Sequence, residues 1–402
     1  MVDPSARYKD LVHPIPFVHA RIPPNNRHFA MDSLPQELID AIIDNVPQPS
    51  LPSCSLVAKR WRRKSQQRVL STISFQSEDK VKRWCTDIPQ ASDGISSYVR
   101  HVNIEEIYSW TEPALLSRML GSLSSLTALS IYGIEIPDEL PGCISRGGLG
   151  KGITTLGLRL PCCTLATLTS MILLLPSLKE LSVEDFIEDC EVMMPNEPPS
   201  TCSVTSKRGP LESLELRGHG VNRIGEALAK FRFTSRRLTS HVDITGIQQL
   251  LLLSSEMVVE LTLWGVWFFS DQAETIMTDL PDLSVGEALP PIHLLSLPAL
   301  TTLAVYVYID RPSPHLENIL RSIGSAPALT SIVIESKGWA SFDYLPLMDL
   351  WADMDRWLSR ISRHAKVEGG LLLTLRQWMV WEGFFPEFRE SGGKIKVDDS
   401  GR

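Results

Sequence analysis

The sequence lacks a long uninterrupted apolar stretch. Its longest apolar runs are of the kind MILLLP and QLLLLSS, well short of the roughly 18 residues that suggest a membrane-spanning helix. The N-terminus has no apolar core of a secretory signal peptide. The chain has only seven cysteines, an odd number scattered over 402 residues, and no Asn-x-Ser/Thr acceptor. These absences predict a protein of the reducing cytoplasm or nucleus without a membrane span.

An excess of positive charge is also missing. Lys and Arg number 39 against 47 Asp and Glu, which gives a formal net charge of -8. Nucleic acids and anionic membranes would not be attracted to such a molecule as a whole, so we expect neither as a partner. The one dense basic run is KRWRRK, Lys59–Lys64. A nuclear import signal or an RNA contact is one interpretation of it, and the basic face of a surface helix is the simpler one.

Motifs for catalysis or metal binding are absent as well. There is no H-E-x-x-H, paired C-x-x-C or G-x-S-x-G motif, and the adjacent Cys162 and Cys163 cannot ligate one zinc ion as C-x-x-C does. The glycine-rich RGGLGKGIT fails the Walker pattern, because Ser145 and Gly152 stand where Gly and Ser or Thr are required. We expect no enzymatic activity, no catalytic residue, no cofactor and no metal.

A repeat of the form L-x-x-L-x-L is the strongest pattern in the chain. Its first, fourth and sixth positions are occupied in seven copies: Leu126, Leu129, Ile131; Ile153, Leu156, Leu158; Leu178, Leu181, Val183; Leu211, Leu214, Leu216; Val258, Leu261, Leu263; Leu300, Leu303, Val305; and Leu329, Ile332, Ile334. A weaker eighth copy is predicted at Thr239, Val242 and Ile244. Two strand-like runs, GGLLLTL and KIKVDD, follow near the end.

Segments with apolar residues at helical spacing lie between the predicted strands. They comprise Leu115, Leu116, Met119, Leu120, Leu123; then Leu165, Leu168, Ile172, Leu175; then Leu316, Ile319, Leu320, Ile323; and finally Leu347, Leu350, Trp351, Met354, Trp357, Leu358, Ile361. Strands that alternate with helices favour parallel pairing through right-handed crossovers. The predicted fold class is therefore α/β, a solenoid with strands on one face and helices on the other.

This repeat resembles the leucine-rich repeat, with two departures. The Asn or Cys that follows the last leucine in that family is absent from all seven copies, and the copies start 25 to 47 residues apart. The resemblance implies an irregular solenoid over residues 97–402, in which the polar contact that holds the turn is missing. Residues 184–210, acidic at first and then rich in Pro, Ser and Thr, are predicted to be an exposed loop.

The segment Met31–Gln67 has more apolar surface than three short helices can bury against one another. Leu38, Ile42 and Val46 form one row of a predicted helix, and Ile39 and Ile43 form a second row beside it. Residues 1–30 are proline-rich, have no periodicity and are predicted to be a disordered tail. Either the rest of the chain or another protein must cover the surplus.

The stretch LPQELIDAIIDNVPQPSLPSCSLVAKRWRR resembles an F-box, from its Leu-Pro start to Trp61. An F-box before degenerate leucine-rich repeats is similar to F-box proteins of fungi. The resemblance implies a three-helix module, here residues 31–75, that docks on a Skp adaptor and through it on a cullin. Residues 76–96 are predicted to be a polar connector, in which the run EDKVKRW can form a short helix. The implied adaptor-binding residues are Leu34, Pro35, Glu37, Leu38, Ile39, Ile42, Leu51, Leu56, Val57 and Trp61.

The resemblance further implies a function, the substrate-recognition subunit of a Skp, cullin, F-box (SCF) type ubiquitin ligase whose repeats recruit an unknown target protein. Two alternatives stay open: a non-degradative interaction scaffold, and an opening segment that merely caps the repeats. Stacked strands offer one long concave surface. Target binding is therefore predicted for residues flanking the last leucines of the copies, namely Tyr132, Arg159, Glu184, Arg217, Trp264, Tyr306 and Glu335.

Overall fold

The computed structural model describes sixteen stretches of the chain. They are residues 34–87, 94–105, 107, 110–112, 114–133, 135–138, 140–147, 151–188, 209–218, 221–241, 245–266, 297–307, 328–336, 348–364, 371–376 and 385–398. The predicted tail, most of the predicted 184–210 loop and the predicted helix at Leu316–Ile323 lie outside these residues. The chain forms two compact units, Met1–Val69 and Leu70–Arg402, called unit 1 and unit 2 below.

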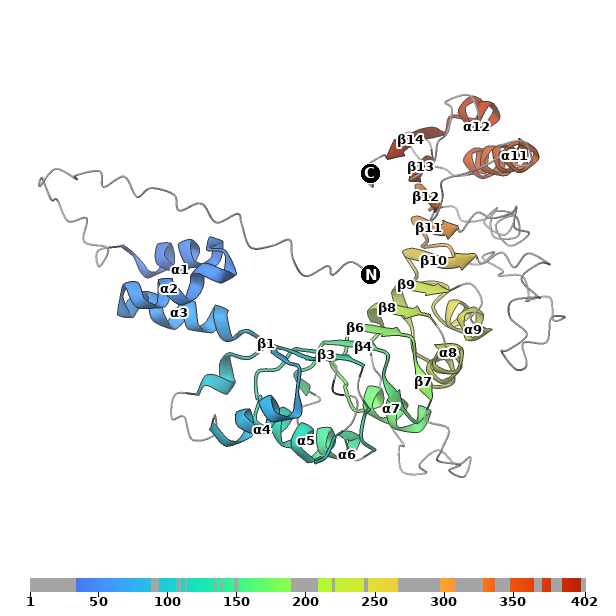
Figure 1. Cartoon of the computed structure of the whole chain (residues 1–402). Helices are drawn as coiled ribbons and strands as arrows, with labels where there is room; N and C mark the ends of the chain where they lie inside the picture. The colour runs from blue at the N-terminus through green and yellow to red at the C-terminus, as the bar shows by residue number, and fades with distance from the viewer. Residues whose placement is uncertain are drawn as a thin grey trace, which may run out of the picture. The chain divides into compact units, whose positions relative to one another are not determined.

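Unit 1 is helical. It contains α1 (Gln36–Asn45), a 3-10 turn η3 (Gln48–Ser50), α2 (Leu51–Val57) and α3 (Lys59–Leu70) (Figure 1). Val46, which precedes Pro47, has extended backbone, so α1 ends there. Pro52 lies in the first turn of α2, where its missing N–H leaves no bond unmade. The guanidinium of Arg68 donates to the carbonyl oxygens of Ile43 and Val46 and so caps the C-terminus of α1.

A small core of its own holds unit 1 together. Ile39, Ile43, Leu51 and Trp61 are buried in it, and Leu34, Val46, Cys54, Ala58 and Val69 pack around them. Ile39 and Ile43 are four residues apart and thus lie on one side of α1. The inward row of α1 is therefore the Ile39 and Ile43 row, and the Leu38 and Ile42 row points away from the core.

Unit 2 is built on a parallel sheet of 12 strands that follow one another in chain order (Figure 1). Its strands are β1 (Thr72–Phe75), β2 (His101–Glu105), β3 (Ala128–Tyr132), β4 (Thr155–Arg159), β6 (Glu180–Glu184), β8 (Leu211–Arg217), β9 (Ser235–His241), β10 (Glu260–Val266), β11 (Thr302–Val307), β12 (Ser331–Ser336), β13 (Leu372–Arg376) and β14 (Lys394–Asp398). Two short strands, β5 (Cys162–Cys163) and β7 (Ile187–Glu188), pair separately.

Helices cover one face of this sheet (Figure 1). They are α4 (Glu78–Asp87), η4 (Ile95–Tyr98), α5 (Ala114–Gly121), α6 (Leu140–Gly147), α7 (Leu165–Leu173), α8 (Val221–Lys230), α9 (Thr245–Leu253), α11 (Met348–His364) and α12 (Pro386–Glu390). The strand register aligns one apolar residue per strand beneath them: Ile73, Val102, Leu129, Leu156, Leu181, Leu214, Leu238, Leu261, Leu303, Ile332, Leu373 and Ile395. Successive residues of a strand point to opposite faces of the sheet. This row therefore lies on one face and packs in a continuous core with the helices, while the residues between its members lie on the other face.

Threonines tie neighbouring strands together just before β3, β4, β11 and β12 begin. The hydroxyl of Thr154 donates to the carbonyl oxygen of Thr127 at 3.2 Å, and that of Thr330 donates to the carbonyl oxygen of Thr301 at 3.0 Å. Thr127 and Thr301 make the same contact with Arg100 and Val259. The Asn or Cys of regular leucine-rich repeats is absent, as the sequence indicates, but these threonine contacts provide a polar link at another position of the turn.

The strands of all seven predicted copies are present in the sheet, and so are the two closing strands. The predicted eighth copy was wrong in position: β9 runs from Ser235 to His241, with Leu238 and Ser240 as its buried residues. The helices predicted around Leu116, Leu168 and Leu358 are confirmed as α5, α7 and α11. Ile187 and Glu188, predicted as loop, form the short strand β7.

The structure departs from the predicted boundary near residue 75, and it forms the short helix considered within residues 76–96. β1 pairs with β2, so Thr72–Phe75 belongs to the sheet and not to the helical module. Within the predicted connector, α4 buries Val81, and Trp84 meets Phe75 edge to face with 5.8 Å between ring centroids. The apolar residues of α4 therefore belong to the core of unit 2, and the two units meet at Val69 and Leu70.

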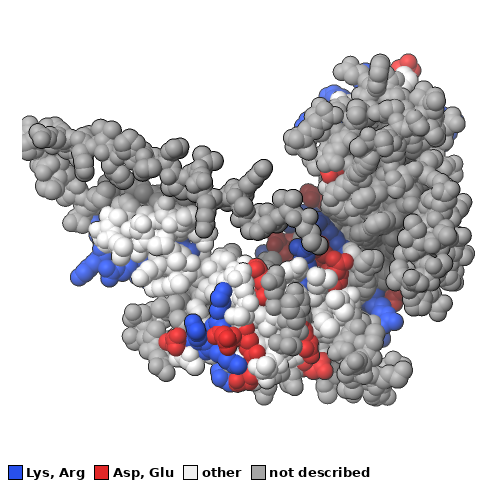
Figure 2. All heavy atoms as spheres, in the orientation of Figure 1, with Lys and Arg blue, Asp and Glu red and all other residues white. Residues whose placement is uncertain are grey.

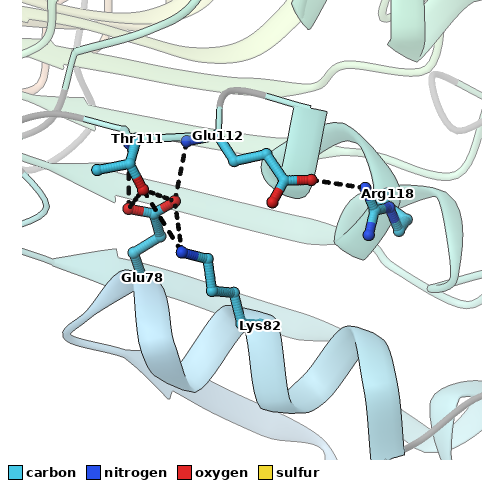
Figure 3. A network of polar contacts seen from close by, with 5 residues as sticks. All are labelled: Glu78, Lys82, Thr111, Glu112 and Arg118. Atoms are coloured by element: carbon cyan, nitrogen blue, oxygen red, sulfur yellow. Dashed lines mark hydrogen bonds and ion pairs between the residues drawn. The ribbon is translucent and has the colours of Figure 1, made fainter.

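A carboxylate from α4 holds the turn that precedes the next helix, α5 (Figure 3). Glu78 accepts hydrogen bonds from the Thr111 hydroxyl, at 2.7 and 2.6 Å from its two oxygens, and from the backbone N–H groups of Thr111 and Glu112, at 3.1 and 3.0 Å. Lys82 lies 3.5 Å from the same carboxylate. The Thr111 hydroxyl, then the two N–H groups and the charge of Lys82, hold the pKa of Glu78 below its ordinary value of 4.5.

Replacing this carboxylate should destabilise unit 2 in a pH-dependent way. Glu78→Gln keeps one acceptor oxygen of two, so we expect the free energy of unfolding to fall by about 1 kcal/mol at pH 7. Since the folded-state pKa is lowered, the ionised group contributes fully above pH 4.5 and its contribution disappears as the pH falls through the folded value. Urea unfolding at pH 7 and at pH 3 measures this. Asp79→Asn, a change of an exposed neighbour, is the control; equal effects of the two variants at pH 7 would contradict the role of Glu78 in holding this turn.

Candidate protein-interaction surfaces

Unit 1 exposes large apolar side chains on two of its helices. Leu38 and Ile42 of α1 are 52% and 43% exposed, and Leu56 and Val57 at the end of α2 are 81% and 54% exposed. We call these four residues the exposed apolar set. The other exposed large apolar residues of the described chain, Ile187, Phe231 and Leu252, are spread over unit 2. Such a concentration of apolar surface in a small module is typical of a protein-binding site.

The predicted adaptor-binding residues fall into two classes. Leu38, Ile42, Leu56 and Val57 are exposed, as are Pro35 and Glu37, and Leu34 is half-buried against the core. In contrast, Ile39, Leu51 and Trp61 are buried. Their side chains lie in the core of unit 1, where they hold α1, α2 and α3 in place, and their predicted contact with a partner stays a prediction.

The predicted target-binding residues lie in register on the sheet face opposite the helices. Tyr132 pairs with Arg159, Arg159 with Glu184, and Glu184 with Arg217. Tyr306 pairs with Glu335 further along the sheet. In the sequence, each of these residues comes directly after the last apolar position of its repeat. The parallel register brings them into one row across the sheet.

Side chains of this row contact one another. The Arg159 guanidinium lies 5.0 Å from the ring centroid of Tyr132, and its Nε lies 3.2 Å from a carboxylate oxygen of Glu184. Arg217 lies over Trp264, with its Cζ 4.3 Å from the ring centroid, and Trp264 stacks on Tyr306 with 3.8 Å between centroids and 4° between ring planes. Cation and aromatic contacts of this kind fix side chains on a surface.

The row is unevenly accessible. Glu335 is buried, so it is the least available of the predicted residues for a partner. Arg159, Glu184 and Arg217 keep between a third and three fifths of their side chains exposed. Arg217 also pairs with Glu215 of the same strand. The accessible part of the row is therefore its Tyr132 to Tyr306 portion, which presents paired charges and aromatic edges.

Some features of these surfaces were missed in the sequence. Strands β1 and β2 precede the first predicted copy, although Val99, Val102 and Ile104 repeat its spacing with β-branched residues.

Among the described residues no group of three or more His, Cys, Asp or Glu could hold a metal ion. No helix in the described part of the chain is long and apolar enough to cross a membrane.

Comparison with known proteins identifies one part of the chain. No curated protein matches the sequence. Among solved structures the chain is similar to one described as the crystal structure of the Rad7 and Elc1 complex in yeast, with 12% identity, 77% of this chain and 91% of that chain covered, and a TM-score of 0.28. Residues 31–70 match the F-box domain family. The chain thus contains an F-box domain, formed by the helices that carry the exposed apolar set.

Proposed function

We propose that the chain is the substrate-recognition subunit of an SCF-type ubiquitin ligase. In this function the F-box domain docks on a Skp adaptor, the adaptor connects it to a cullin, and unit 2 recruits a target protein for ubiquitination. The observation that carries the proposal is the exposed apolar set on an F-box domain. The chain itself would be no enzyme, because transfer of ubiquitin is the work of the associated ligase.

Unit 2 would supply target recognition. Its sequential parallel strands and outer helices fit an irregular leucine-rich-repeat-like solenoid, and the Tyr132 to Tyr306 portion of the row is the proposed target-binding surface. A cytoplasmic or nuclear location follows from the proposal, since the ligase acts there. The alternative is a scaffold that binds its partner without degradation. Co-purification of a cullin with the wild-type chain, lost together with the adaptor in F-box variants, separates the two.

Truncating the exposed apolar set should weaken adaptor binding without unfolding the chain. Leu38→Ala and Leu56→Ala each remove apolar surface that the adaptor would bury. The binding free energy should weaken by about 1 to 2 kcal/mol, so that the Kd rises roughly fivefold to thirtyfold. Titration calorimetry of the full-length chain with a purified Skp adaptor measures the affinity. Both side chains already face solvent, so the melting temperature should stay unchanged.

Leu252→Ala is the matched control, because Leu252 is a 65% exposed leucine of α9 in unit 2. It should leave the adaptor affinity unchanged. If the three variants behave alike, the exposed apolar set is not the docking surface, and the interpretation of residues 34–61 as a simple cap of the repeats gains support.

A further inference from the structure

Helix α3 carries all six Lys and Arg residues of the F-box domain, and three of them are engaged within it. Arg60 donates to the side-chain oxygen of Gln36 at 3.3 Å, and Lys64 pairs with Asp44 at 3.1 Å. Arg68 caps α1 through two carbonyl oxygens. Residues 60, 64 and 68 are four apart, so they form one row that faces α1.

The other three cations point in a different direction. Lys59, Arg62 and Arg63 are exposed, whereas Trp61 and Ser65 of the same helix are buried. Positions 59, 62 and 63 have the i, i+3, i+4 spacing of a single helix face. Their side chains have no hydrogen bond or ion pair with any described residue. We call Lys59, Arg62 and Arg63 the basic face.

Charge in this chain is unevenly distributed. Residues 34–70 contain six cations and three acidic side chains, a formal charge of +3, although the whole chain carries -8. The three acidic residues all lie on α1, and of these Asp44 is already paired with Lys64. Figure 2 shows Lys and Arg side chains gathered at one side of the helices of unit 1, next to uncharged surface. Among the described residues 34–70, the basic face therefore has no acidic side chain paired with it.

The basic face adjoins the exposed apolar set. Lys59 follows Val57 after a single residue, Ala58, whose extended backbone turns the chain from α2 into α3. A partner that covers Leu56 and Val57 would thus come close to Lys59. Its approach would place low-dielectric surface beside cations that only solvent now screens, which strengthens their attraction to acidic groups.

We propose that the basic face binds an acidic segment of the same adaptor that covers the exposed apolar set, and that it steers the two proteins together. This inference rests on the proposed function and adds the chemistry of the partner. The adaptor would present an apolar docking surface that is bordered by carboxylates. Unpaired charges at the rim of an interface act mainly on the association rate and on its salt dependence, whereas the apolar contacts determine dissociation.

An import receptor is a weaker explanation for the same residues. A receptor that took the whole run KRWRRK as an extended peptide would have to unfold α3. That would break the Lys64 pair with Asp44 and expose the buried Trp61. Only the three residues of the basic face are available in the folded domain, and they are presented on a helix.

The test measures adaptor association by surface plasmon resonance from 50 to 500 mM NaCl. A full-length variant with Lys59→Gln, Arg62→Gln and Arg63→Gln should associate about tenfold more slowly at 50 mM NaCl, with a flatter salt dependence. Its dissociation rate should change less than threefold. The variant with Lys151→Gln, Lys230→Gln and Arg236→Gln removes three exposed cations of unit 2 and should behave as wild type.

Three outcomes overturn the inference. If the basic-face variant associates as wild type at every salt concentration, the acidic partner does not exist. If its adaptor kinetics are unchanged but the full-length chain no longer accumulates in nuclei, the residues serve import. If the unit 2 control variant associates equally slowly, the loss of positive net charge alone explains the slower association. Failure of the proposed function is distinguishable, because the wild-type chain itself would then show no adaptor binding.

Discussion

Trp61→Ala should unfold the F-box domain and leave unit 2 folded. Trp61 is one of four fully packed apolar residues in the core of unit 1. Truncating a buried Trp typically lowers the free energy of unfolding by about 3–5 kcal/mol, which approaches the whole stability that so small a helical module can have. Unit 2 has a separate core, so its unfolding transition should stay where it is. Differential scanning calorimetry should show the loss of one transition, and adaptor affinity should fall more than a hundredfold.

Trp61→Phe is the informative companion variant. The indole N–H of Trp61 is buried and has no hydrogen-bond partner among the described residues. The Phe variant therefore removes an unsatisfied donor while it keeps most of the aromatic surface. We expect the free energy of unfolding to fall by about 1 kcal/mol and adaptor binding to be retained. If Trp61→Ala abolished adaptor binding but left the calorimetric transitions unchanged, Trp61 would be a contact residue after all, contrary to its burial.

Asp355→Ala should detach helix α12 from α11. Asp355 is a buried residue of α11, and its two carboxylate oxygens accept the backbone N–H groups of Glu387 and Phe388 at 3.0 and 2.8 Å. These are the first donors of α12, because Pro386 has no N–H. The loss of two charge-assisted bonds, with both donors left without an acceptor, should lower the stability of this end of unit 2 by about 3 kcal/mol.

Hydrogen exchange followed by mass spectrometry gives this prediction a local readout. Amides of residues 385–398 should lose protection in Asp355→Ala, while those of β3 and β4 keep theirs. Asp355→Asn serves as the control: its amide oxygen still accepts one N–H group but its NH₂ group opposes the other, so it should fall between wild type and the Ala variant. Unchanged exchange in the Ala variant would show that apolar packing of Phe388, also buried, is sufficient to hold α12.

The repeat spacing predicted most of the sheet because each strand buries the same two positions. Where those positions hold Leu, Ile or Val, the strand was identified from Leu126 onward, whereas β2, with Val99, Val102 and Ile104, was missed. β9 was misplaced because its inward residues include Ser235 and Ser240. Ser235 is satisfied inside the protein: its N–H donates to the hydroxyl of Ser254, and its own hydroxyl donates to the carbonyl of Arg237. A buried polar residue with such partners leaves no apolar signal in the sequence.

The binding surfaces were predictable in part. Helical spacing revealed two apolar rows in α1, but spacing is the same for an inward and an outward row. The choice between Leu38 and Ile39 depends on tertiary contacts, here the core that Ile39 shares with Leu51 and Trp61. On the sheet, the residues after the last apolar position of each copy were predicted to share one surface, and the register places them in a common row. That Arg217, Trp264 and Tyr306 stack on one another required the register and the side-chain geometry.

The strictly sequential strand order of unit 2 bears on how the chain is made. Each of the 12 strands has as its neighbours in the sheet only those strands that come just before and just after it among the sheet's strands. No strand has to wait for a distant part of the sequence, so loop-closure entropy stays small at every step. A ribosome that releases the chain from its N-terminus would deliver β1, then β2, then β3 in the order in which they pair. The sheet can therefore grow strand by strand during synthesis, with β1 as its constant edge and only the newest strand as the edge still to be paired.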